Sequence, residues 1–140
     1  MATYTLNPPL NNIDLAVGTP VRCGEIFENH MFVYLDPNDG NRAKRANCLQ
    51  TNPYEHMAFG IALGKTVYIN QPVHILQSGQ LQARFNLFVA AGKLFVLSQT
   101  AGKMMDMSDL QSGDWITVIG YSTADDTMTF DIRNTGVQVP

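Results

Sequence analysis

Glycine and proline recur along the whole chain and set the strongest limit on what it can fold into. Eleven Gly and seven Pro stand at nearly regular spacing among 140 residues, so they interrupt every stretch long enough for a good helix. Short apolar segments such as 31–35 and 93–98 lie between them. Short strands with turn signals about every ten residues are typical of a sandwich or barrel. The sequence therefore predicts an all-β protein.

Nine apolar segments are expected to form the strands. They are 21–27, 31–35, 58–63, 65–70, 73–76, 85–89, 93–98, 115–121 and 127–132. In 65–70, Val67 and Ile69 share one face, which predicts a half-buried strand. Pro72 limits the following strand to a late start or to a sheet edge. Gly60 and Gly120 stand at apolar strands where space is expected to be tight.

Turns are expected at 36–40 and at 77–80. In the first, Pro37 presets one backbone dihedral and Gly40 tolerates the left-handed region. Residues 42–50 stay ambiguous, because their alanines and charged residues favour a helix while about nine residues are short for an isolated helix.

One compact domain is expected from 140 residues that are 45% hydrophobic and 15% charged. Nine Lys and Arg against 12 Asp and Glu give a formal net charge of -3, which lacks the field of a non-specific nucleic-acid binder. The first residues have no positive cluster followed by an apolar core, and no apolar run approaches a membrane helix in length. We therefore expect synthesis in the cytoplasm and no nucleic-acid or membrane partner.

The first 20 residues differ from the rest, because prolines and asparagines separate their apolar side chains. This composition predicts an extended arm over 1–20, with little helix or strand of its own, attached to a β-domain over 21–140. An apolar arm outside a strand ladder must cover the domain or a neighbouring molecule. Its candidate partner-binding residues are Leu6, Pro8, Pro9, Leu10, Ile13 and Leu15.

No group of residues has the pattern of a catalytic or metal site. No serine stands in a G-x-S-x-G elbow, and no glycine-rich phosphate loop is present. Cys23 and Cys48 lack C-x-x-C spacing and are interpreted as small buried hydrophobes, with a disulfide between them left open. Glu55 and His56 are adjacent, so they point to opposite faces of a strand and form a poor chelate. We expect no enzyme activity, no cofactor and no metal.

Methionines, positive charges and acidic pairs form three local clusters in the sequence. Met104, Met105 and Met107 share one loop-like stretch and are interpreted as core or interface filler rather than as a specific binding site. The positive charges within 42–45 favour a solvated strand face over a polyanion site. The acidic pairs lie in expected loops, where solvation explains them. These pairs are Asp106 with Asp109 and Asp125 with Asp126.

A series of short sequence motifs, most of which contain glycine, occurs between about Val17 and Ile132. We call these motifs the glycine-marked phrases. The phrases are 17–21 (VGTPV), 42–46 (RAKRA), 59–62 (FGIA), 64–69 (GKTVYI), 91–98 (AGKLFVLS), 100–103 (TAGK), 112–114 (SGD) and 118–121 (VIGY). In this order the chain resembles the small cement or decoration proteins on the capsids of tailed bacteriophages.

The resemblance implies a compact β-barrel or β-tulip-like domain that assembles as a homotrimer on the outer surface of the virion. Its partners would be a second and third copy and the major capsid protein, which the N-terminal arm often reaches. No catalytic residues are implied. A protein that binds only the expanded lattice stabilises that state by mass action against internal pressure. Three sets of weak contacts in a trimer add through high effective concentration.

Two other functions stay open. The first is a phage tail or head-fibre module that binds a host surface or a glycan, with Trp115 and the tyrosines as candidate sugar contacts. Trp115 follows a turn at the head of an apolar strand, however, and this position favours core packing. The second is a small β-barrel enzyme such as a hydrolase, for which no motif was found.

Overall fold

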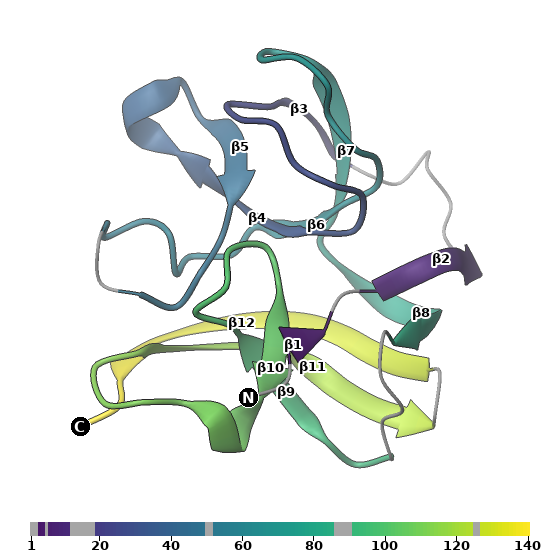
Figure 1. Cartoon of the computed structure of the whole chain (residues 1–140), viewed down its shortest axis with the longest axis vertical. Coiled ribbons are helices and arrows are strands. Elements are labelled where there is room, and N and C mark those ends of the chain that lie inside the picture. The colour runs from purple at the N-terminus through teal and green to yellow at the C-terminus, as the bar shows by residue number, and fades with distance from the viewer. Residues whose placement is uncertain (1–2, 5, 12–18, 50–51, 86–90, 125–126) are drawn as a thin grey trace.

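The protein consists of two antiparallel β-sheets, which confirms the predicted all-β class. A computed structural model describes residues 3–4, 6–11, 19–49, 52–85, 91–124 and 127–140, with the burial of side chains described within 20–49, 52–77, 91–123 and 128–140. One sheet has seven strands in the order β1-β10-β9-β11-β12-β8-β2, and the other has five in the order β3-β7-β6-β4-β5. Figure 1 shows the five-stranded sheet above the seven-stranded one.

The five-stranded sheet comprises β3 (Thr19–Arg22), β4 (Phe32–Asp36), β5 (Arg42–Arg45), β6 (Gly60–Ala62) and β7 (Pro72–Leu76). The seven-stranded sheet comprises β1 (Thr3–Tyr4), β2 (Leu6–Asn11), β8 (Ser78–Phe85), β9 (Leu94–Leu97), β10 (Met104–Asp106), β11 (Trp115–Ala124) and β12 (Thr127–Gln138). Two short 3-10 helices are η2 (Pro37–Asp39) and η3 (Met107–Asp109).

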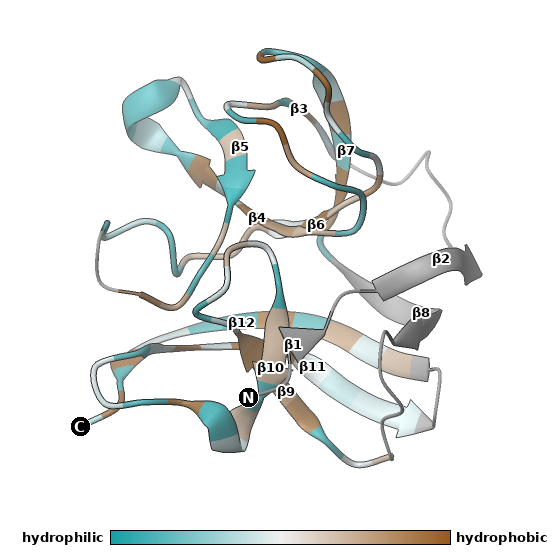
Figure 2. Ribbon diagram, viewed as in Figure 1, coloured by the Kyte–Doolittle hydropathy of each residue, from teal (hydrophilic) through white to brown (hydrophobic). Residues whose placement is uncertain are grey.

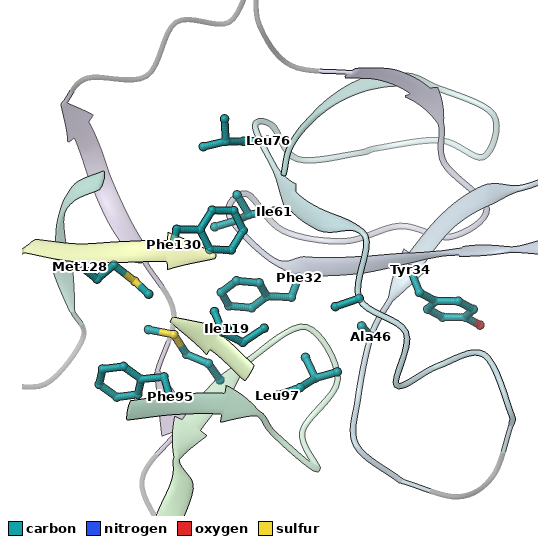
Figure 3. Close-up of a cluster of buried hydrophobic side chains, with 12 residues drawn as sticks. Phe32, Tyr34, Ala46, Ile61, Leu76, Phe95, Leu97, Ile119, Met128 and Phe130 are labelled. Carbon is teal, nitrogen blue, oxygen red and sulfur yellow. The ribbon is translucent and has the colours of Figure 1, made fainter. Parts of the chain in front are cut away.

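The largest hydrophobic core lies between the two sheets (Figure 3). Phe32 of β4 and Phe130 of β12 meet there with ring centroids 6.0 Å apart. The loop between β9 and β10 reaches across to the other sheet, since the Gly102 carbonyl accepts from Phe32 N–H at 3.0 Å and Gly102 N–H donates to Ala46 at 2.8 Å. The two sheets are thus joined by packing and by backbone hydrogen bonds.

The five-stranded sheet curls until its two edges touch. A parallel bridge pairs Cys23, just after β3, with Ala43 of β5, and Gly24 N–H donates to the Ala43 carbonyl at 2.8 Å. One bridge is not a full ladder, so the arrangement is barrel-like without complete closure. A second core cluster fills its interior, with Cys23, Val33 and Ile75 among the buried members.

The expected turn at 77–80 is wrong. Only Gln77 separates β7 from β8, and Ser78 and Gly79 already pair with Asp131 and Phe130 of β12. The polar, glycine-containing sequence is a turn signal locally, but the ladder with β12 keeps this chain extended as it passes from one sheet to the other (Figure 1).

The turn at 36–40, the ambiguous segment 42–50 and the position of Pro72 can each be compared with the strands. The turn over 36–40 is confirmed as η2 and the left-handed Gly40, and the ambiguous segment 42–50 begins as strand β5. The expectation for Pro72 is wrong, because β7 begins at Pro72 itself and lies between β3 and β6. Proline is accepted at the first residue of an interior strand because its missing N–H need not pair there.

The N-terminal segment contributes strands, so the expectation that it has little strand of its own is wrong for its described part. Thr3–Tyr4 pairs with β10, and Leu6–Asn11 pairs with β8 at the far edge of the same sheet. The register shifts between Asn7 and Asn11, across the two prolines, as befits an edge strand. Leu6, Pro8, Pro9 and Leu10 therefore lie in β2. The other two candidate arm residues, Ile13 and Leu15, lie outside the described residues.

Gly60 and Gly120 are positions where a side chain has no room. A Cβ at Gly120 would lie 2.0 Å from the Thr129 carbonyl oxygen, and one at Gly60 would lie 2.5 Å from the Leu76 carbonyl oxygen. We predict that Gly60→Ala and Gly120→Ala each lower the free energy of unfolding by about 1–3 kcal/mol or more, measured by urea denaturation. Gly64→Ala is the matched control, since nothing lies within 4 Å of its Cβ. Equal stability of all three variants would contradict this packing.

Candidate binding surface at the tip of the five-stranded sheet

Two loops at one end of the five-stranded sheet are tied together by the buried Thr66. Its hydroxyl accepts from Phe27 N–H at 2.8 Å and donates to the Glu25 carbonyl at 3.1 Å. The Thr66 N–H donates to the Phe27 carbonyl at 2.9 Å, and Asn70 N–H donates to the Cys23 carbonyl at 2.9 Å. These bonds join residues about 40 positions apart, so the loop after β3 and the loop before β7 form one unit.

The loop before β7 is also clasped by its own side chain. The Gln71 amide oxygen accepts from Val67 N–H at 2.8 Å, and its amide nitrogen donates to the Lys65 carbonyl at 3.1 Å. The Val67 N–H and the Lys65 carbonyl therefore both have hydrogen-bond partners within the same loop. The loop is held in a defined shape before any partner arrives.

Four large apolar side chains project from this pair of loops into solvent. Ile26 is 56% exposed, and Val67, Tyr68 and Ile69 are 62%, 57% and 52% exposed. We call these four residues the apolar tip. The loop before β7, which carries three of them, lies on the side of the five-stranded sheet away from the seven-stranded one (Figures 1 and 2). Exposed apolar groups on two loops that are hydrogen-bonded to each other mark a candidate interaction site.

The apolar tip overturns the predicted half-buried strand over 65–70. Thr66, placed on the polar face by the alternation, is 2% exposed, whereas Val67 and Ile69 are exposed. The alternation is real, but the hydrogen bonds of Thr66 to the other loop decide which residue turns inward. The sequence signal for a loop here is the run Asn70-Gln71-Pro72, whose first and last residues favour turns.

Ion pairs compensate the positive residues of β5. Arg42 contacts Asp39 at 2.8 Å, and Lys44 contacts Asp36 at 2.8 Å and Asp39 at 3.2 Å. Arg45 contacts Glu25 at 3.1 Å. The hydrogen bond from Lys44 lowers the pKa of Asp36 and of Asp39, and the same contacts raise the pKa of Lys44. The cluster is therefore a paired strand face with little free charge for a polyanion.

The three clustered methionines separate into two environments. Met104 and Met105, in β10, are fully buried and fill two different cores, so neither can contact a partner. Met107, in η3, is 42% exposed and is the member of the cluster that a partner could touch.

Asp106 caps η3 by accepting from Ser108 N–H at 3.0 Å, and this bond lowers its pKa. Asp125 and Asp126 lie outside the described residues.

Trp115 is stacked against His56 rather than open on both faces. The two rings are 4.0 Å apart and nearly parallel, and the burial of His56 lowers the pKa of its imidazole. Thr117 of the same strand donates to the His56 carbonyl, which holds this segment on β11. One face of the indole thus packs against the imidazole, and the Trp115 side chain is half-buried, as expected for a ring at the edge of a core.

The two cysteines are free and buried, as predicted, and their thiols are not paired. Burial raises the pKa of the Cys48 thiol to about 12, and the negative charge of Asp114 adds to this effect. A thiol held neutral in this way is a poor nucleophile and metal ligand. Within the described residues no group of three His, Cys, Asp or Glu side chains is arranged to hold a metal ion.

Comparison with protein-family models, with curated proteins and with solved structures finds no match to this chain. Across the part of the chain that the structure describes, no helix has the length and apolar character needed to cross a membrane.

The hydroxyl of Thr66 can be tested as the link between the two loops. We predict that Thr66→Val, which keeps the shape but removes the hydroxyl, lowers the free energy of unfolding by about 1–3 kcal/mol, because buried partners lose their hydrogen bonds. Hydrogen exchange at Phe27 N–H should also become faster. Thr66→Ser keeps the hydroxyl and should retain slow exchange. Unchanged exchange in Thr66→Val would show that the loops do not depend on this residue.

The raised pKa of Cys48 makes stability sensitive to alkaline pH. The folded thiol keeps its proton to about pH 12, whereas an unfolded cysteine releases it near pH 9. The unfolded state therefore binds fewer protons above pH 9, and the free energy of unfolding falls by about 1 kcal/mol per pH unit just above that pH. Urea denaturation between pH 8 and 10 should show a flatter slope for Cys48→Ala than for the wild type, even if the variant is less stable throughout. Parallel slopes would contradict a neutral folded thiol.

Proposed function

We propose that this protein is a structural component of a bacteriophage virion that binds the expanded head lattice as a trimer and stabilises it against internal pressure. The observation that carries the proposal is the apolar tip, formed by Ile26, Val67, Tyr68 and Ile69 on hydrogen-bonded loops. The order of glycine-marked phrases in the sequence supports the same class. Under this proposal the major capsid protein is the partner and the outer surface of the head is the location.

The energetics suit a protein that acts by binding alone. Burying the exposed remainder of each tip side chain is worth about 1 kcal/mol, so one tip gives a modest contact. Three tips in a trimer add their contributions, because after the first contact the others bind at high effective concentration. A ligand selective for the expanded lattice then stabilises that state by its differential affinity. No chemical step is needed.

Several reactive or polar side chains among the described residues have a structural role. The Cys48 thiol is neutral and buried, Met104 and Met105 fill the core, and Asp106 caps a helix. Each of these side chains is thus accounted for by the fold.

A head-fibre or tail module that binds a glycan is the second candidate. The exposed ring of Tyr68 is the observation in its favour, because sugars stack on exposed aromatic rings. Trp115 supports it less, since that side chain is half-buried and His56 leaves at most one face of the ring for a sugar. Saturable binding to a glycan with no binding to capsids would favour this second function.

The apolar tip can be tested directly with expanded capsids prepared without the protein. The wild-type protein should bind them saturably at a fixed ratio to the lattice. A variant with Ile26→Ser, Val67→Ser and Ile69→Ser should bind at least tenfold more weakly, because it removes most of the apolar tip. Both proteins should unfold at nearly the same denaturant concentration, since the replaced side chains are exposed.

Val137→Ser is the matched control, because Val137 is 53% exposed on β12 of the other sheet. It should bind capsids as the wild type does. Failure of the wild-type protein to bind would refute the proposed function, and full binding by the triple variant would refute the role of the apolar tip.

A further inference from the structure

A pocket of about 460 Å³ lies beside the apolar tip, where the two edges of the five-stranded sheet approach each other. Arg22 at the end of β3 and Arg42 at the start of β5 stand on its walls, together with Asn70 from the loop that carries the tip. Val21 and Leu35 supply an apolar part of the lining. The pocket thus combines two guanidinium groups with an apolar wall.

Asn70 brings the two guanidinium groups to one place. Arg22 Nη1 donates to the Asn70 carbonyl at 2.9 Å, and Arg42 Nε contacts the Asn70 side-chain oxygen at 3.3 Å. The backbone of Asn70 has a φ of 72°, in the left-handed region that asparagine tolerates better than most residues. This conformation directs the backbone and side-chain oxygens of a single residue toward two different arginines. Two guanidinium groups held together in this way favour an anion wherever their charge is not already balanced by a carboxylate.

The ion pairs around the pocket leave one positive charge uncompensated. Arg42 and Lys44 share the carboxylates of Asp36 and Asp39, so these four groups are balanced. Arg22 forms no ion pair with any carboxylate among the described residues, and its contact is with a neutral carbonyl. A single excess charge matches a monoanion better than a doubly charged phosphate. The net charge of -3 also disfavours a nucleic-acid backbone as the source.

We propose that the pocket between Arg22 and Arg42 binds a carboxylate, supplied by an acidic side chain of the protein surface on which the apolar tip docks. The planar guanidinium fork matches the geometry of a carboxylate. The methylene groups of Asp or Glu fit against Val21 and Leu35. Asn70 follows Ile69 directly in the chain, so the pocket and the apolar tip meet the same partner surface. The identity of that surface as a capsid lattice rests on the proposed function; the carboxylate site itself does not.

The isolated protein tests the carboxylate site without any capsid. Titration with sodium acetate, followed by NMR at the arginine Nε–H groups, should give saturable shifts at Arg22 and Arg42 in the millimolar range. Sodium chloride at equal ionic strength should not. Arg133 is the control, because it is 74% exposed and pairs with Asp131 on the other sheet. Equal shifts at Arg133, or no saturation, would overturn the site. Saturation by inorganic phosphate alone would overturn the carboxylate assignment.

Capsid binding tests what the site contributes to docking. Arg22→Gln keeps a hydrogen-bond donor but removes the uncompensated charge, and we expect about fivefold weaker binding with a flatter dependence on salt concentration. Arg42→Gln should weaken binding as well. Because this variant also loses its ion pair with Asp39, its unfolding midpoint is compared with that of the wild type. Arg133→Gln should match the wild type.

The outcomes separate the two proposals. If the wild type binds capsids and Arg22→Gln binds them equally well with the same salt dependence, the docking role of the carboxylate site is wrong while the proposed function stands. If the wild type binds no capsid, the proposed function fails, and the acetate titration still decides the site.

Discussion

The packing of the two sheets against each other is the interaction on which the rest of the structure depends. Phe32, Ile61 and Leu76 from the five-stranded sheet meet Phe95, Ile119 and Phe130 from the seven-stranded sheet, and all six are buried (Figure 3). The curled five-stranded sheet fills its own interior with the second cluster, but Phe32, Ile61 and Leu76 on its other face are buried against the seven-stranded sheet. Because β7 leads into β8 through Gln77 alone, the chain itself holds the sheets together at this core. The loop around Gly102 adds backbone hydrogen bonds across the same junction.

The apolar tip is separate from the cores of the five-stranded sheet. Two buried clusters pack on the five-stranded sheet, while Ile26 and the residues Val67–Ile69 stay exposed to water. Thr66 and Gln71 satisfy the polar groups of the loops, so these loops need little ordering when a partner binds. Arg22 and Arg42 lie next to this preorganised surface and add charge recognition to apolar contact.

The turn at 36–40 and most of the strand segments could be predicted, because their signals lie within a few neighbouring residues. Proline at 37, the left-handed Gly40 and the apolar run before them determine β4 and η2 locally. The turn expected at 77–80 and the buried face expected for 65–70 failed for the opposite reason. Partners far along the chain, Phe130 for Gly79 and Phe27 for Thr66, decided both. Edge pairing likewise turned the proline-rich segment Leu6–Asn11 into strand β2.

The sequence by itself determined the all-β class and the burial of the two cysteines, because glycine and proline spacing and a low charge content act through local propensity and solvation. Only the tertiary structure decided which residues form the apolar tip and the arginine pocket. Arg22, Arg42 and Asn70 come together because the edges of one curled sheet meet at Cys23 and Ala43. That meeting depends on long-range strand pairing, which the alternation of apolar and polar residues does not encode.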